Sequence, residues 1–92
     1  MIGIPQRFNL SQNYPNPFNP STKINYELPV DEKVSLKIFD ISGKQVSSLV
    51  NEVQKAGYYS VDFSAASLSS DVYFYTLTSA DFVSTKRMLL VK

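Results

Sequence analysis

The sequence predicts an all-β protein, an immunoglobulin-like antiparallel β-sandwich of about seven strands. Apolar and polar residues alternate with a period of two along most of the chain, which is the pattern of half-buried strands. Turn-forming residues recur about every ten residues, as they do in sandwiches of this type. No convincing helical pattern and no alternation of strands with helices is present. The chain of 92 residues is short enough that we expect a single domain.

The composition excludes several classes of function. Hydrophobic residues make up 43% of the chain and charged residues only 18%, so we expect it to fold rather than remain disordered. Nine Lys and Arg against eight Asp and Glu leave a net charge of +1, which indicates neither a nucleic-acid partner nor an anionic lipid surface. No apolar run approaches the roughly 20 residues of a membrane helix, so no membrane-spanning segment is expected.

Catalysis is not predicted either. The chain has no Cys and no His, which excludes thiol, zinc and Ser-His-Asp chemistry. Its carboxylates fall at predicted turns or on polar strand faces, where solvated surface charge is the expected role. We therefore predict no enzyme activity, no cofactor and no metal site.

The first third of the chain contains all five prolines, interleaved with Asn in residues 11–21. Proline removes a backbone donor and Asn initiates turns through its side chain, so this segment is predicted to be a series of tight turns. We expect Tyr14 and Phe18 to pack it across one end or edge of the sandwich.

Two strands are predicted next, over residues 22–28 and 34–38, where apolar side chains fall on every second position. A turn at residues 40–43 follows, with Gly43 where φ can be positive. Residues 46–50 are ambiguous, because their apolar positions suit a helix as well as a strand. We favour a bulged strand, since Ser47 and Ser48 are poor helix formers and the neighbouring segments are strands.

The second half of the chain continues the pattern. A turn at Gly57 leads to a strand over residues 59–63, and Leu68 is expected to cover one end of the core. Residues 72–78 are the most β-prone segment, predicted to be a central strand buried on both faces. Tyr73 is placed either as a tyrosine corner or as an ordinary core residue. A short hairpin turn at residues 79–81 leads to the closing strand, in which we expect the chain to end.

These strands predict both a core and a set of outward apolar residues. The outward residues are Phe39, Tyr58, Leu89 and Val91, which on edge strands would indicate a docking patch. The predicted core includes Ile24, Tyr26, Leu36, Ile38, Val61, Phe63, Tyr73, Tyr75 and Leu77.

Several segments in register resemble the type A C-terminal sorting domain of the type IX secretion system. The opening of that domain resembles residues 8–22 and 24–29, with their Asn-Pro repetition. The similarity covers about residues 5–92, and its other segments are residues 36–40 with Gly43, 49–50, 56–63, 72–75 and 86–92.

The resemblance implies that the domain is a secretion signal rather than an enzyme. Residues 1–7 would be a linker or the start of the chain, and residues 8–92 the sorting domain. Such domains follow a cargo protein that reaches the periplasm through its own signal peptide, and the outer-membrane translocon of the type IX system recognises them. A surface peptidase then often removes the domain, while the cargo is released or attached to lipopolysaccharide. One departure is Asp71, where the family usually has Gly.

The candidate recognition residues lie mainly in the last strand. Met88 and Leu90 alternate as core residues, whereas Leu89 and Val91 are expected to face outward beside Lys86, Arg87 and Lys92. The strand is therefore expected to offer a translocon a basic, apolar edge. The proposed recognition set is Gly57, Lys86, Arg87, Leu89, Val91 and Lys92. The alternative is that these residues only complete the sandwich. Peptidase cleavage is expected near residues 4–9.

A second function remains open from the sequence, an immunoglobulin-like accessory module that binds carbohydrate or protein. Such a module would need exposed aromatic side chains gathered on one sheet face or loop rim. Tyr14, Phe39 and Tyr58 are the only candidates.

Overall fold

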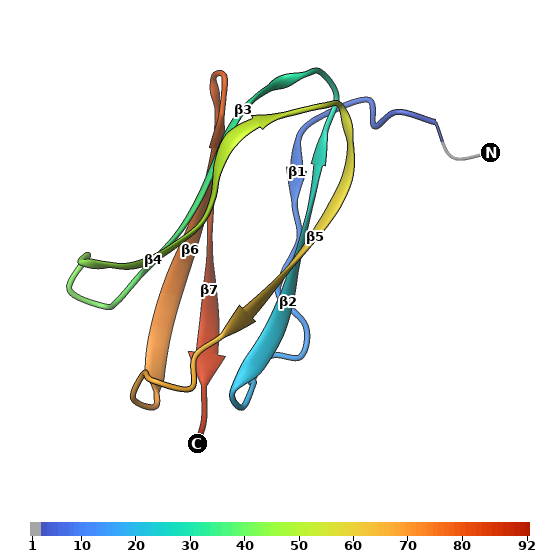
Figure 1. The fold of residues 1–92 in the computed structure, drawn as a ribbon. Coiled ribbons are helices and arrows are strands. Elements are labelled where there is room, and N and C mark those ends of the chain that lie inside the picture. The colour runs from blue at the N-terminus through green and yellow to red at the C-terminus, as the bar shows by residue number, and fades with distance from the viewer. Residues whose placement is uncertain (1–2) are drawn as a thin grey trace.

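The computed structural model describes residues 3–92, so the first two residues of the predicted linker lie outside the described chain. The described residues form seven strands in two antiparallel sheets, which confirms the predicted immunoglobulin-like sandwich (Figure 1). One sheet has the order β1-β2-β5 and the other β4-β3-β6-β7. The strands are β1 (Asn9–Leu10), β2 (Ser21–Leu28), β3 (Glu32–Phe39), β4 (Gln45–Gln54), β5 (Gly57–Ser64), β6 (Asp71–Ser79) and β7 (Phe82–Leu90).

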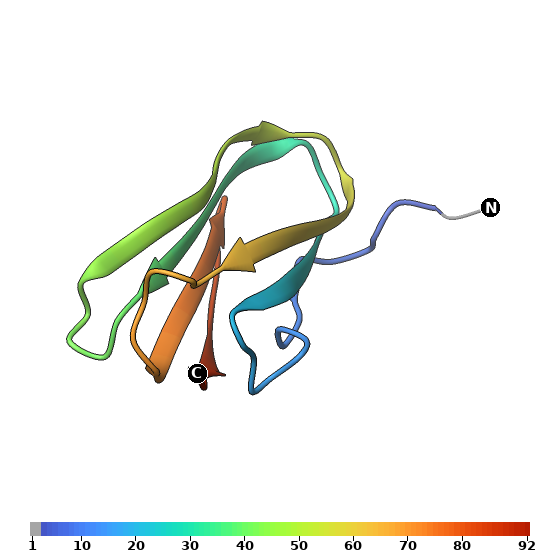
Figure 2. The ribbon, with the colours of Figure 1, turned by 60° about the horizontal axis from the view of Figure 1, so that its bottom comes forward.

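The chain changes sheet three times. It passes from β2 to β3, from β4 to β5 and from β5 to β6, as the strand order requires. Figure 2 shows β4 continuing into β5 over one end of the sandwich. These crossings close one core between the sheets, because each sheet then turns its apolar face toward the other.

Strands β2 and β3 form because their side chains alternate between the core and solvent. In β2, Thr22, Ile24, Tyr26 and Leu28 are buried while the intervening residues are exposed or half-buried. The same alternation runs through β3. The period of two therefore predicted both strands correctly.

Strand β4 carries two bulges, which explains its ambiguous sequence. The pairing with β3 shifts between Leu36 and Lys37 and again between Ile38 and Phe39. Each shift inserts an extra residue in β4, Leu49 at the first and Val46 at the second. Both pack against the core beside Val50, so the bulges produce a spacing that resembles a helical face. The preference for a bulged strand is confirmed.

The core contains eight of the nine residues predicted for it. Val61 is the exception, being only partly buried at the edge of the core, where Leu68 also packs as predicted. The buried set also includes Leu10, Phe18, Leu28, Val34, Val50, Ala65, Met88 and Leu90.

Strand β6 is central in its sheet but is not buried on both faces. Tyr73, Tyr75 and Leu77 point into the core, whereas Val72 and Phe74 on the other face are only half-buried. The prediction of two buried faces is wrong because the outer face of this sheet has no second layer over it (Figure 1).

Three local predictions about single residues and the last strand are settled by the structure. The Tyr73 hydroxyl donates a hydrogen bond to the Ser69 carbonyl at 2.7 Å, which makes it a tyrosine corner, and burial raises its pKa. Gly43 has a φ of 88° in its turn, as predicted. The closing strand ends at Leu90, so the expectation that the chain ends inside a strand is wrong.

Candidate recognition site at the end of the last strand

Strand β7 forms one edge of the four-stranded sheet, as the recognition hypothesis requires. Met88 and Leu90 are each 1% exposed and point into the core, whereas Leu89 is 38% and Val91 48% exposed. The predicted division of this strand into core and outward residues is therefore correct.

Lys86 does not lie where the sequence interpretation placed it. It occupies the same side of β7 as Met88 and Leu90, is half-buried, and pairs with Tyr75 across the sheet. Arg87 lies on the other side with Leu89 and pairs with Phe74. Alternation therefore separates the two cations, and only Arg87 shares a face with Leu89.

Gly57 lies at the opposite end of the sandwich from the end of β7. It opens β5 and pairs with Leu28, whereas Ser64, seven residues along β5, pairs with Ser21 near the end of β7. At about 3.3 Å per residue the separation along β5 is roughly 23 Å. The structure thus places Arg87, Leu89 and Val91 at alternate positions at the end of the chain, followed by Lys92, but does not bring Gly57 to them.

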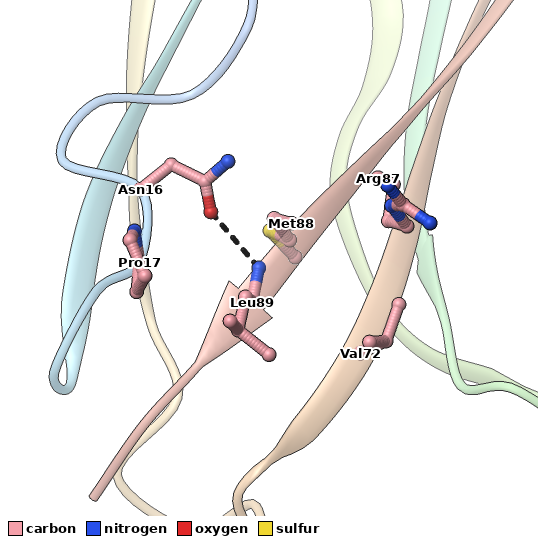
Figure 3. Close-up of a pocket in the computed structure, with 6 residues that line it drawn as sticks. All are labelled: Asn16, Pro17, Val72, Arg87, Met88 and Leu89. Carbon is pink, nitrogen blue, oxygen red and sulfur yellow. Dashed lines mark hydrogen bonds between the residues drawn. The ribbon is translucent and has the colours of Figure 1, made fainter.

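The outer edge of β7 is occupied at its C-terminal end by residues 12–18, which we call the clasp. The Phe18 N–H donates to the Leu89 carbonyl at 2.9 Å, and the Val91 N–H donates to the Phe18 carbonyl at 3.0 Å. The Leu89 N–H donates to the side-chain oxygen of Asn16 at 3.0 Å (Figure 3). The side-chain amide of Gln12 donates to the Arg87 carbonyl at 2.7 Å. The clasp therefore satisfies, over residues 87–91, backbone groups that an open edge would offer to another strand.

Phe18 anchors the clasp in the core. Its side chain is 2% exposed, and its ring lies 6.3 Å from the ring of Phe63, tilted by 57°. The expectation that Phe18 packs the Asn-Pro segment onto the sandwich is confirmed.

Tyr14 does not share that role, contrary to the sequence prediction. Its side chain is 80% exposed. Only its backbone joins the fold, through hydrogen bonds in both directions with Lys23 at 3.0 and 2.9 Å. The turn that forms this bridge directs the aromatic ring outward.

A buried asparagine supplies the second anchor of the clasp. Asn13 is 2% exposed, and its side-chain amide donates to the Thr22 hydroxyl at 3.0 Å and to the Pro15 carbonyl at 3.2 Å. The Thr22 hydroxyl itself donates to Pro15 at 2.8 Å. Every polar group of this small network has a partner, which is the condition for burying it at low cost.

Tyr75 ties the start of the clasp to the central strand β6. Its hydroxyl accepts a hydrogen bond from the Asn13 N–H at 2.8 Å and donates one to the Ser11 carbonyl at 2.7 Å. Burial raises the pKa of Tyr75 to about 12, opposed by the hydrogen bond from Asn13. The hydroxyl therefore stays protonated, and able to donate, at higher pH than that of an ordinary tyrosine.

A shallow hollow of about 260 Å³ lies between the clasp and the strand. Figure 3 shows Asn16 and Pro17 on one side of it and Leu89 and Val72 on the other. Arg87 is the only charged residue in its lining, which Met88 completes. The hollow has no acid, base or nucleophile, so its chemistry suits contact with an apolar side chain.

The last residue is fixed to the connection between β5 and β6. The Lys92 N–H donates to the Ser70 hydroxyl at 2.9 Å, and its ammonium group donates to the Ala66 carbonyl at 2.7 Å. Asp71 follows this connection, paired with Leu90, and its carboxylate accepts from the Val72 N–H at 2.7 Å. Among the described non-glycine residues only Ala80 has a positive φ, so Asp71 replaces Gly here without backbone strain.

The aromatic candidates for an accessory binding module are scattered. Tyr14 adjoins Lys23 and Tyr58 pairs with Glu27, both on the three-stranded sheet, while Phe39 lies on the other sheet. They form no common platform. Within residues 3–92 no three Asp or Glu side chains are grouped so that they could hold a metal ion. The same residues contain no helix long and apolar enough to cross a membrane.

Sequence reasoning missed the contribution of Gln12, Asn13 and Asn16 to this site. The only signal was the repetition of Asn with Pro, which indicated turns but not what the side chains would bind. Their hydrogen-bond partners Tyr75, Arg87 and Leu89 lie more than 60 positions away in the sequence.

Comparison with known proteins identifies the chain through one match. The family model described as "Secretion system C-terminal sorting domain" matches residues 12–92, from the first residue of the clasp to Lys92. No curated protein and no solved structure gives a significant match. The match covers most of the chain and includes both the clasp and the end of β7. The chain belongs to the secretion system C-terminal sorting domain family and is a C-terminal sorting signal of the type IX system, whose cargo is destined for the cell surface or for secretion.

Proposed function

We propose that this domain directs a cargo protein, attached on its N-terminal side, from the periplasm across the outer membrane through the type IX translocon. The observation that carries the proposal is the family match over residues 12–92. The family is a non-catalytic signal, in keeping with a chain that lacks Cys and His. In this role the translocon recognises the surface of the folded domain.

The surface that we propose the translocon recognises, called the reading surface below, is the end of β7. Arg87, Leu89, Val91 and Lys92 lie there, and the apolar side chains of Leu89 and Val91 are exposed between the two cations in sequence. The backbone N–H and carbonyl of Leu89 are already bonded to the clasp. Recognition of this residue therefore acts through its side chain, rather than through strand addition.

Lys86 and Gly57 remain in the proposed set of translocon-recognition residues, although they lie elsewhere on the domain. Lys86 lies on the inner side of an edge strand, where it is half-buried and borders solvent. Gly57 would form a separate contact at the far end of β5, because the structure places it away from β7.

We further propose that the sorting peptidase cuts before Pro5. Pro5 is buried, and the Phe8 ring stacks on Phe82 with centroids 5.2 Å apart. A protease needs an extended, accessible substrate, so the bonds after Pro5 are poor substrates in the folded domain. The expected cleavage interval of residues 4–9 narrows to bonds upstream of Pro5. N-terminal sequencing of released domain tests this proposal.

The translocation proposal is tested with a fluorescent reporter fused before residue 1 in a bacterium that has a type IX system. The test variant is Leu89→Thr with Val91→Thr and Lys92→Gln. The matched control is Val30→Thr with Ile41→Thr and Lys55→Gln, which also removes two exposed apolar side chains and one cation. The melting temperature of each purified domain is measured in parallel.

We expect the test variant to remain folded and to leave the reporter in the periplasm, while the control is exported. Export of the folded test variant at the wild-type level would contradict the reading surface. Failure of the wild-type domain to export the reporter would contradict the function itself.

A further inference from the structure

The outer faces of the two sheets differ in chemistry. On the three-stranded sheet the outward positions are polar apart from Tyr58, and they carry one Lys against two carboxylates. Lys23 forms an ion pair with Asp62 at 3.3 Å, and Glu27 lies further along the same strand. This face has the composition of an ordinary solvated surface.

The four-stranded sheet presents a face that is both apolar and basic. Its central part includes Lys37, Phe39, Val72, Phe74, Arg87 and Leu89, which we call the basic-apolar face, and Thr76 and Thr85 lie in the same row as Lys37. Phe39, Phe74 and Arg87 form one row across three strands, and Val72 and Leu89 form the next. Half-buried aromatic and aliphatic side chains thus lie side by side on an uncovered sheet.

The charge on this face has a single sign. Lys33 and Lys37 of β3 and Arg87 of β7 point outward from the four-stranded sheet. The carboxylates that the strands contain, Glu32, Glu52 and Asp71, share the side of the inward residues Val34 and Tyr73 by alternation. No Asp or Glu within the described strands therefore neutralises the outer face, although the whole chain carries a net charge of only +1.

This composition favours a protein partner over a lipid surface. Electrostatic binding to anionic lipid takes clusters of about four to eight Lys and Arg, and this face has three cations spread over two strands. Protein interfaces are instead enriched in aromatic residues and Arg, surrounded by polar groups. The hollow of about 260 Å³ beside Leu89 continues the face and can accept one apolar side chain.

We propose that the basic-apolar face is a docking surface for a protein that presents carboxylates around an apolar side chain, with that side chain entering the hollow between Pro17 and Leu89. The inference that this partner belongs to the export apparatus rests on the proposed function. The inference that the face binds an acidic, apolar protein surface does not rest on it. Charge complementarity identifies the partner, because unpaired cations around an apolar centre attract an acidic, apolar surface.

Two variants test the face without touching the proposed reading residues. The charge variant is Lys33→Glu with Lys37→Glu, and its control is Lys44→Glu with Lys55→Glu, which changes the net charge equally away from the face. The apolar variant is Phe74→Thr, and its control is Tyr58→Thr, an aromatic residue on a strand of the other sheet. All four are assayed for reporter export, and their melting temperatures identify any variant that fails to fold.

We expect each face variant, while folded, to lower export by about tenfold, as the loss of one substantial interface contact would. We expect both controls to export normally. Normal export by both folded face variants would overturn the proposal.

A second assay tests whether the face binds an acidic, apolar ligand, and it remains informative if the wild-type domain exports no reporter. NMR spectra of the domain are recorded with a short peptide that alternates glutamate and phenylalanine, with its lysine counterpart, and with phosphatidylglycerol vesicles. Shifts centred on Phe74 and Leu89, produced by the glutamate peptide alone and weakened by salt, support the proposal. Binding only to the vesicles, or binding to none of the probes, overturns it.

Discussion

The side-chain oxygen of Asn16 accepts a hydrogen bond from the backbone N–H of Leu89 at 3.0 Å, although 73 positions separate the two residues. This bond joins the Asn-Pro segment to the last strand and occupies a donor that an edge strand would otherwise expose (Figure 3). The end of β7 is therefore held from both sides, by β6 through the sheet and by the clasp along its outer edge.

Replacing Asn16 with Ala should loosen this edge without unfolding the domain. The lost hydrogen bond has a typical net value of about 0.5–1.5 kcal/mol, so amide exchange at Leu89 should accelerate by roughly 2- to 10-fold. Asn19→Ala is the control, since Asn19 is an exposed residue next to the clasp. Equal exchange rates at Leu89 in the two variants would show that the Asn16 contact does not hold the edge.

Replacing Tyr75 with Phe should destabilise the domain by about 1–3 kcal/mol. The change leaves the Asn13 N–H and the Ser11 carbonyl without their hydrogen-bond partner in a buried place. Urea unfolding measures the loss, and Tyr58→Phe, at an exposed position, is the control. A midpoint unchanged from wild type would mean that water replaces the hydroxyl in both contacts.

Replacing Phe63 with Ala should cost roughly 3–5 kcal/mol, a large part of the 5–15 kcal/mol that stabilises a typical domain. Phe63 is 4% exposed and packs beside Phe18, so its removal leaves a cavity between the sheet and the clasp. Thermal unfolding should show a strongly lowered midpoint. An unchanged midpoint would place Phe63 outside the core.

The stability of the domain should fall at alkaline pH. Burial raises the pKa of both Tyr26 and Tyr75 from 10.0 to about 12, so the folded state holds protons that the unfolded state releases. The free energy of unfolding should be insensitive to these groups below pH 10 and should decrease between pH 10 and about 12. Urea midpoints across this range measure the slope, and Tyr75→Phe should reduce it. A slope that Tyr75→Phe leaves unchanged would contradict the raised pKa of Tyr75.

Local patterns in the sequence predicted most of the strands because side-chain alternation is a property of each strand alone. The same rule could have placed Lys86 correctly, since it stands two positions before Met88. Strand β1 has only two residues and gives no periodic signal. The outer face of β6 looked buried because its residues are apolar, but burial depends on whether another layer covers them.

The clasp could not be predicted at the level of its contacts. Composition indicated a turn-rich segment, and aromatic residues within it indicated anchors. Whether an aromatic side chain of a turn points inward depends on backbone geometry, which separates buried Phe18 from exposed Tyr14. The hydrogen bonds to β7 join opposite ends of the chain, and no local pattern encodes such pairs.

The parallel bridge between Phe18 and Leu90 has a mechanical consequence. When a load pulls on the chain before Phe18 while the region after Leu90 is held, the two segments slide past each other along their length. The hydrogen bonds between them are then loaded together in shear, instead of being opened one after another from an end. A domain joined in this way resists extension by a force applied on opposite sides of the bridge.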